Sequence, residues 1–297
     1  MKTTNFEGAR VIPGPGSHQG SDRSMGALLI DAGKITTEDA ERILRHAKEK
    51  DLRFGDAAVA LRLVTLDDVQ HVLARQFDYP YLQPGESAVA RSVVAAWSPF
   101  GRQVEALRAL RSQLLLRWFT GERDRKAIAV VSHARGDGRS HLAANLAVVF
   151  SQLGEKTLLV DADMRNPTQH TLFALSNSIG LSTVLAERAG MEAVQRVPAF
   201  VDLSVLPAGT IPPNPLELLS RGAFAKAMQW IGDTFDVVIM DTPSAVDGTD
   251  FQLVGAKAGG ALLVGRRNRT GTSQCADMAD AVRASGAVLV GNVLNER

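Results

Sequence analysis

A glycine-bearing loop in the middle of the chain has the composition of a phosphate-binding site. It runs from Ser132 to His141, reads SHARGDGRSH, and joins an apolar run to a helical pattern. Glycines permit a tight backbone whose N–H groups can surround phosphate oxygens, and the N-terminus of the helix adds partial positive charge. The predicted phosphate-binding residues are Gly136, Asp137, Gly138, Arg139, Ser140 and His141.

Two positions of this loop depart from the common pattern G-x-x-x-x-G-K-[ST]. Arg139 stands where the pattern has lysine, and His133 stands where it has its first glycine. Arginine keeps the positive charge, but it is planar and bulkier than lysine. By itself, the loop can also be interpreted as the glycine-rich turn between a strand and a helix that any doubly wound sheet contains.

Three aspartates lie at the ends of two other apolar runs. Asp161 and Asp163 close the run LLVDAD, and Asp241 closes VVIMD. The carboxyl ends of parallel strands meet at the edge where open α/β sheets bind ligands. Three acids beside a phosphate loop repel one another without a cation, and Ser140 with Asp241 is the usual pair that holds Mg²⁺ on a nucleotide. The set therefore predicts a nucleotide–Mg²⁺ site.

Apolar runs that alternate with helical stretches must position these residues. Runs that are apolar on both faces indicate a parallel sheet with helices on both faces, here an α/β domain over residues 99–297 that starts with a helix over about 103–119. The runs span residues 127–132, 157–163, 203–208, 237–242, 261–265 and 288–294.

The part of the chain before this domain is helical and internally repeated. Residues 1–22 predict a flexible tail, residues 23–82 a small helical domain, and residues 83–98 a linker. Within the small domain Gly26 and Gly55 lie 29 residues apart in similar segments, and threonine with following acids begins each long helix. Two copies make a paired-helix domain and not a solenoid.

Composition excludes several classes of protein. The 297 residues carry 33 Lys and Arg against 32 Asp and Glu, a net charge of +1 that argues against a nucleic-acid binder. One cysteine, Cys275, permits no intrachain disulfide and suits a reducing compartment. We expect no secretory signal and no membrane span, because the sequence has neither a signal-type apolar region nor 18 consecutive apolar residues.

The three chemical segments together resemble those of the bacterial tyrosine kinases of capsule and exopolysaccharide assembly. The order SxxxGxGxS, LLVDADMR and VVIMDTP is similar to the family's three Walker motifs. The segment LPAGTIPPNPLELL at 206–219 is similar to another family segment, which cell-division and partitioning ATPases of the superfamily lack. The resemblance covers residues 99–297 and implies a MinD/ParA-like P-loop NTPase fold.

The resemblance also implies roles for single residues. Arg139 and the loop N–H groups would hold the β- and γ-phosphates of ATP, and Asp163 would join Ser140 and Asp241 in or near the Mg²⁺ shell. Asp161 would accept the tyrosine proton, and Asn295 would contact adenine. A helix of the form E-x-x-R-x-x-R would mediate contacts between subunits of a homo-oligomer through Glu105, Arg108 and Arg111.

Such kinases act with a membrane-embedded chain-length determinant, so the resemblance implies that protein as the partner and a cytoplasmic location peripheral to the inner membrane. Family members commonly carry a C-terminal tyrosine cluster. Here Tyr79 and Tyr81 are the two tyrosines, and the sequence stops soon after its last apolar run. We therefore expect any kinase activity to act on another protein and not on a tail of this chain.

Residues 24–82 resemble the N-terminal domain of type II secretion and pilus ATPases, some of which bind cyclic di-GMP through two 24-residue motifs. The first motif would span 24–47 and the second 53–76. The second keeps Arg53 and Gln76, whereas the first has Ser24 in place of the arginine. Either cyclic di-GMP binding through Arg53 and Gln76 or a protein-docking role is open.

Two alternatives to an active tyrosine kinase follow from the departures in the sequence. The first is an ATP-binding, cyclic di-GMP-responsive assembly switch that transfers no phosphoryl group, which Arg139 and the missing tyrosine cluster favour. The second is an ATPase of the partitioning type, which shares the acids of the site.

Overall fold

The computed structural model describes residues 24–66, 68, 69, 72, 73, 80–83, 85–122 and 125–296. The chain divides into two compact units, Met1–Tyr79 and Pro80–Arg297. The predicted tail over residues 1–22 lies outside the described residues, as do Gln76 and Tyr79.

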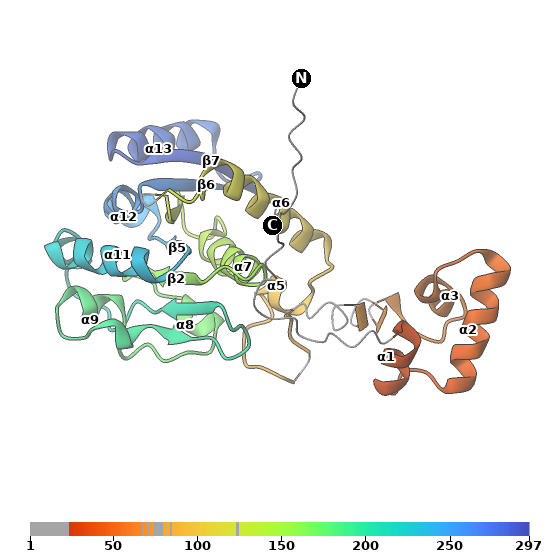
Figure 1. Ribbon diagram of the computed structural model, residues 1–297. Coiled ribbons are helices and arrows are strands. Elements are labelled where there is room, and N and C mark those ends of the chain that lie inside the picture. The colour runs from red at the N-terminus through yellow and green to blue at the C-terminus, as the bar shows by residue number, and fades with distance from the viewer. Residues whose placement is uncertain are drawn as a thin grey trace, which may run out of the picture. The chain divides into compact units, whose positions relative to one another are not determined.

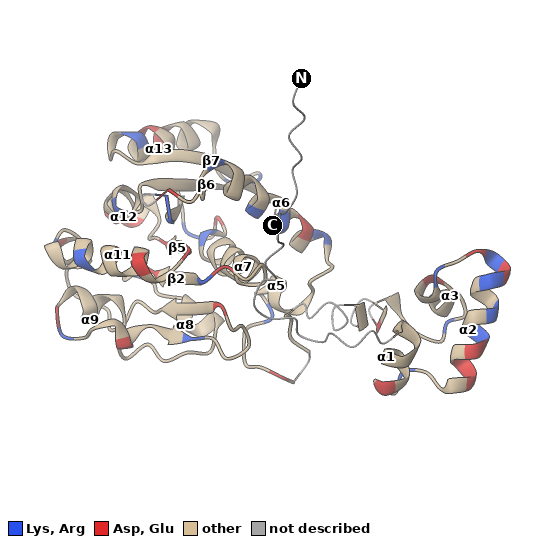
Figure 2. Ribbon diagram, in the orientation of Figure 1, with Lys and Arg blue, Asp and Glu red and all other residues tan. Residues whose placement is uncertain are grey.

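The N-terminal unit contains helices α1 (Met25–Asp31), α2 (Thr37–Lys50) and α3 (Phe54–Ala60) (Figure 1). The predicted start of α2 is confirmed: Thr36 and Asp39 form a capping box in which each side chain accepts from the other's backbone N–H at 3.1 Å. Thr65 and Asp68 repeat this arrangement. Figure 2 shows acidic residues at the start of α2 and mainly basic ones toward its end, which complements the helix dipole.

The sequence repeat is also a structural repeat, since α1 and α3 begin at equivalent positions of the two copies. The helices cross at their glycines. A Cβ on Gly26 would lie 3.2 Å from the ring of Phe54, and a Cβ on Gly55 would lie 3.3 Å from the sulfur of Met25 and 2.8 Å from Val69. Met25 and Phe54 are equivalent in the repeat, so the contact is reciprocal. It encloses a small core around Leu29, Ile43, Ala57, Ala58 and Val64.

The second unit is built on one sheet, whose order within the described residues is β3-β4-β2-β5-β1-β6-β7. Neighbouring strands are parallel except for β3, which pairs antiparallel with β4. The predicted runs become strands β1 (Ala127–Ser132), β2 (Thr157–Asp161), β4 (Leu203–Leu206), β5 (Val237–Asp241), β6 (Gly260–Arg266) and β7 (Val288–Asn295). The two-residue strand β3 (Gln195–Arg196) has no counterpart in the sequence prediction.

Helices cover both faces of this sheet (Figure 1). One face is covered by α5 (Val94–Trp97), α6 (Arg102–Arg117), α7 (Arg139–Ser151) and α8 (Gln169–Leu172). The other is covered by α9 (Leu181–Leu185), α10 (Pro215–Leu219), α11 (Gly222–Thr234), α12 (Asp250–Ala258) and α13 (Thr272–Ala284). The short 3₁₀ turns η1 (Met191–Ala193) and η2 (Ala245–Asp247) lie between α9 and β3 and between β5 and α12. Within the described residues, each helix is too short or too polar to cross a membrane.

Residues 83–98, which the sequence predicts as a linker, pack onto the α/β unit where they are described. Val93 and the residues of α5 are buried against α7. Asn145 of α7 accepts from the Ala95 N–H at 2.9 Å, and Gln152 donates to the carbonyls of Pro80 and Ala95 at 2.7 and 3.0 Å. This cover explains why α7 is buried on all sides, and the division between units falls before Pro80.

The end of α6 is anchored to the sheet by Trp118. Its side chain is 4% exposed, and the indole N–H donates to the Ala127 carbonyl at 2.8 Å. The ring lies against Gly260 at the start of β6, where an added Cβ would come within 2.5 Å of it. Position 260 therefore has to be glycine, because a side chain there would overlap the Trp118 ring.

We expect Gly260→Ala to lower the free energy of unfolding by about 1–3 kcal/mol, because the ring must move out of a packed core. The control is Gly232→Ala in α11, where an added Cβ meets nothing within 4 Å, and alanine should be neutral or stabilise by up to about 1 kcal/mol. Urea unfolding followed by tryptophan fluorescence measures both, since Trp97, Trp118 and Trp230 all lie in this unit. Equal midpoints for the two variants would contradict the packing argument.

Candidate functional site

The loop between β1 and α7 has the backbone that a phosphate cradle needs. Gly136 and Gly138 have φ angles of 81° and 100°, which glycine adopts most readily. Asp137 is buried, and its carboxylate accepts from the Ala134 N–H at 2.9 Å and the Thr270 hydroxyl at 3.2 Å. The loop is therefore fixed by its own aspartate and by the segment after β6.

The structure brings the predicted acids together at the carboxyl edge of the sheet. Asp161 and Asp241 are register partners on the adjacent strands β2 and β5. Both are fully buried, and Asp163 is 3% exposed. The Ser140 side chain hydrogen-bonds to Asp241. The four residues predicted from three separate segments thus form one cluster.

Burial governs the ionisation of these acids. It raises the pKa of Asp161 well above its usual range, and the nearby charge of Asp241 adds to the effect. Burial also raises the pKa of Asp163, to about 6. Burial likewise raises the pKa of Asp241, although Arg139 and hydrogen bonds from Ser140 and Gln169 oppose it.

The contacts of Asp161 tie it to the start of α8. Its Oδ2 accepts from the backbone N–H groups of Thr168 and Gln169 at 3.0 and 2.9 Å. Its Oδ1 is buried and has no hydrogen-bond partner within the described part of the chain. One carboxylate oxygen is thus structural, and the other is available for chemistry.

Gln169 links the elements of the cluster, and it is not among the residues predicted from the sequence. Its side chain is fully buried, and its amide donates to Asp241 Oδ2 at 2.8 Å and to the Ser140 carbonyl at 3.1 Å. It lies eight residues after Asp161, in a helix of only four residues with no apolar periodicity. No signal in a single sequence distinguishes it from a surface glutamine.

Arg139 turns into the cluster. Its Nη1 donates to Ser132 Oγ at 2.7 Å, its Nη2 to Asp163 Oδ2 at 3.3 Å, and its Nε lies 3.5 Å from Asp241 Oδ1. The residue is 6% exposed. A guanidinium presents donors in a planar fork, which allows one side chain to serve three partners.

The donor set fits Mg²⁺. This ion prefers oxygen ligands and is usually held by one or two carboxylates together with substrate phosphates. Ser140, Asp163 and Asp241 offer only oxygens, and the buried Oδ1 of Asp241 accepts no hydrogen bond from the described part of the chain. Among the described residues no three His, Cys, Asp or Glu side chains form a closed metal centre. The arrangement therefore suits a metal ion that arrives with phosphate oxygens and completes its shell with them.

Two further arginines, which are not among the residues predicted from the sequence, join the site to the segment after β5. Arg135 of the phosphate loop donates from Nε to both carboxylate oxygens of Asp247, at 2.8 and 2.9 Å. Arg165 donates from Nε to both oxygens of the fully buried Asp250, at 3.2 Å. The segment that follows Asp241 is therefore held from both sides.

His141 and Asn295 border a cavity of about 510 Å³ between α6 and β7. Asn295 donates to the Asp137 carbonyl at 3.0 Å, and a Cβ on Gly138 would lie 2.1 Å from its amide nitrogen. His141 lies 3.3 Å from the Gln103 amide. The cavity adjoins the phosphate loop, so a nucleoside joined to phosphates in that loop would reach it. The adenine contact of Asn295 stays a prediction.

The three residues predicted to mediate subunit contacts make contacts within the chain. Arg108 pairs with Glu105 on the surface of α6, and Arg111 donates to the Val149 carbonyl of α7. Glu105 is exposed, whereas both arginines are half-buried. The Arg111 contact joins α6 to α7, the Arg108–Glu105 pair lies within α6, and a role between subunits stays a prediction.

In the N-terminal unit, Arg53 is exposed at the N-cap position of α3 and makes no capping hydrogen bond with its side chain. Its predicted companion Gln76 lies outside the described residues. Cyclic di-GMP binding therefore stays a prediction that rests on Arg53 and the sequence spacing.

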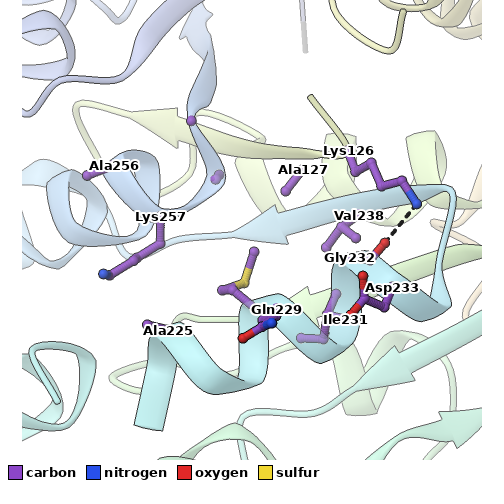
Figure 3. A pocket seen from close by; sticks show the side chains of 13 residues that line it. Lys126, Ala127, Ala225, Gln229, Ile231, Gly232, Asp233, Val238, Ala256 and Lys257 are labelled. Carbon is purple, nitrogen blue, oxygen red and sulfur yellow. Dashed lines mark hydrogen bonds between the residues drawn. The ribbon is translucent and has the colours of Figure 1, made fainter. Parts of the chain in front are cut away.

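A cavity of about 550 Å³ lies at the opposite edge of the sheet, between α11 and α12 (Figure 3). Ala127 and Gly259 place it at the amino ends of β1 and β6. Lys126 donates to the carbonyls of Gly232 and Phe235 at 2.7 and 3.3 Å, and so caps the end of α11. This cavity contains none of the predicted residues.

We expect Gln169→Ala to weaken the binding of Mg²⁺-nucleotide by about 10–100-fold, the usual effect of losing a residue that orients a metal ligand. The control is Gln152→Ala, which removes a buried amide with two carbonyl contacts far from the acids. Calorimetry with Mg·ADP measures both. If the two variants bind equally well, Gln169 has only a structural role.

Comparison with known proteins is consistent with this site. A family model described as an AAA domain matches residues 125–253. The tyrosine-protein kinase YwqD of Bacillus subtilis (strain 168) is 37% identical over 209 residues, which cover 70% of this chain and 87% of YwqD. The crystal structure of the chimerical protein CapA2B2 superimposes with a TM-score of 0.65 at 34% identity, covering 76% of this chain and 98% of that one.

The predicted fold class is confirmed as a MinD/ParA-like P-loop NTPase. The cell-division ATPase MinD of Pyrococcus furiosus shares the fold with a TM-score of 0.51 at 24% identity, over 57% of this chain and 71% of that one. The match to YwqD covers most of that protein at 37% identity, so it shows the family as well as the fold. The chain belongs to the family of bacterial tyrosine-protein kinases.

Proposed function

We propose that the chain is an ATP-dependent protein-tyrosine kinase that regulates the polymerisation and export of an exopolysaccharide. One observation carries this proposal: Ser140, Asp161, Asp163 and Asp241 meet beside a glycine-rich loop in a chain of the tyrosine kinase family. Phosphoryl transfer needs mainly positioning and charge stabilisation, and this cluster supplies both.

The proposed roles follow from where each group lies. The N–H groups of residues 136–140 and the guanidinium of Arg139 hold the β- and γ-phosphates. Ser140, Asp163 and Asp241 hold Mg²⁺, which neutralises charge on the phosphates when bound. Gln169 orients Asp241 through its amide.

Asp161 is the proposed acceptor of the tyrosine proton. Its Oδ1 has no partner within the described residues, and burial raises its pKa well above the usual range, so that it takes up a proton readily. Asp161 is fully buried, and its other oxygen, Oδ2, is held by the backbone at the start of α8.

The proposed partner is a membrane chain-length determinant, which would place the kinase at the cytoplasmic face of the inner membrane. The family resemblance supports this, and the similar structure CapA2B2 is itself a chimera. The proposed homo-oligomer would use the α6 face that carries Glu105, Arg108 and Arg111.

A second candidate function is a nucleotide-binding assembly switch that transfers no phosphoryl group. The observation that favours it is Arg139, which stands in place of the usual lysine and pairs with Asp163 and Asp241. Such a protein would bind Mg·ATP and change its assembly without phosphorylating tyrosine.

A kinase assay separates the two functions. With Mg·ATP and a tyrosine-containing copolymer, in the presence of a chain-length determinant's cytoplasmic tail, we expect transfer to tyrosine. Asp241→Asn should reduce it by about 100-fold or more through loss of a metal ligand. Asp280→Asn, which removes an exposed acid of α13, should leave it unchanged. Nucleotide binding without any tyrosine phosphorylation would support the switch instead.

The raised pKa of Asp163 predicts a pH dependence of nucleotide binding. Protons and Mg²⁺ compete for the carboxylate, so affinity for Mg·ADP should be full above pH 7 and fall below about 6, where Asp163 becomes protonated. Calorimetry across this range should show a steeper loss for the wild type than for Asp163→Asn. The phosphate of ADP titrates in both proteins, so parallel curves would rule out Asp163 as the titrating group.

A further inference from the structure

The guanidinium of Arg139 is the positive charge at the centre of the acid cluster. Its three nitrogens lie against Ser132, Asp163 and Asp241, at 2.7, 3.3 and 3.5 Å. The side chains of Arg139, Asp163 and Asp241 are 7%, 4% and 0% exposed. Water therefore contributes little to stabilising these charges.

Two ionised carboxylates that share a dry site need a cation between them. Asp163 and Asp241 both face Arg139, at 3.3 and 3.5 Å. A lysine ammonium is a single point charge on a flexible stem, whereas the guanidinium fork reaches both carboxylates and Ser132 at once. The replacement of lysine by arginine thus has a structural consequence in this chain.

We propose that Arg139 is a built-in counter-ion that occupies the place between Asp163 and Asp241 that Mg²⁺ needs. The guanidinium and the metal ion then exclude each other. Free Mg²⁺ binds poorly, because it must displace a buried ion pair. Nucleotide phosphates offer Arg139 a new partner, and the two carboxylates become available to the metal only when the nucleotide is present.

This inference rests on the nucleotide–Mg²⁺ site of the proposed function, but not on kinase activity. It predicts that Mg²⁺ binds to the site together with the nucleotide, and that Mg²⁺ without nucleotide binds poorly. It also predicts that a variant without the guanidinium depends on a metal ion for stability.

Arg165 provides the matched comparison. It also pairs with a fully buried carboxylate, Asp250, at 3.2 Å. Among the described residues Asp250 is the one carboxylate that forms an ion pair with Arg165, so removing the arginine leaves one unpaired acid and no set of metal ligands. Loss of Arg165 should destabilise the protein without making it responsive to Mg²⁺.

The experiment is thermal unfolding of the full chain without nucleotide, at mildly alkaline pH, in EDTA and in millimolar Mg²⁺. Wild type should unfold at the same temperature in both. Arg139→Met should unfold roughly 5–15 °C lower in EDTA, as expected for a buried pair with one partner removed, and Mg²⁺ should restore at least half of that loss. Arg165→Met should be destabilised in both solutions equally.

The proposal fails if Mg²⁺ does not stabilise Arg139→Met, or if Mg²⁺ alone stabilises the wild type as much. Should Arg139→Met not fold, Mn²⁺ binding measured by electron paramagnetic resonance decides. Arg139→Lys keeps the charge and should bind free Mn²⁺ at least about tenfold more tightly than wild type, and equal affinities would overturn the proposal. None of these readouts requires turnover, so a protein without tyrosine kinase activity can still support the counter-ion role.

Discussion

Three carboxylates buried at one edge of a sheet are the constraint on which this structure depends. An ionised acid without water must be paired or protonated. Asp161 is held by two backbone N–H groups, Asp163 by those of Arg165 and Asn166, and Asp241 by the amide of Gln169. The short helix α8 and the loop before it owe their position to these contacts. The acids therefore fix α8 and the loop before it through these hydrogen bonds, and the same hydrogen bonds hold the acids in place.

The parts of the fold that follow from local rules could be predicted from the sequence. Strands buried on both faces are continuous apolar runs, so β1 and β5 are visible at once. The acid cluster is predictable because parallel strands bring their carboxyl ends to one edge. The threonine at the start of α2 was found because a hydroxyl there satisfies free N–H groups.

Other parts depend on contacts distant in sequence. Gln169 is recognisable only through Ser140 and Asp241, which lie 29 and 72 residues away. Residues 83–98 look like a linker because they contain a Pro-Gly pair and small polar residues, yet Asn145 of α7 and Gln152 at its end bind them to the unit. The inward turn of Arg139 is a choice of rotamer that depends on two distant acids, Asp163 just after β2 and Asp241 at the end of β5.

The glycine crossing in the N-terminal unit limits how its sequence can change. Gly26 faces the ring of Phe54, and Gly55 faces Met25, so each copy of the repeat supplies the bulky residue that fits against the other copy's glycine. A larger residue at 26 calls for a smaller one at 54, whereas a larger residue at 55 needs room from both Met25 and Val69. The two copies therefore cannot diverge independently, and related sequences should show these pairs varying together across the repeat.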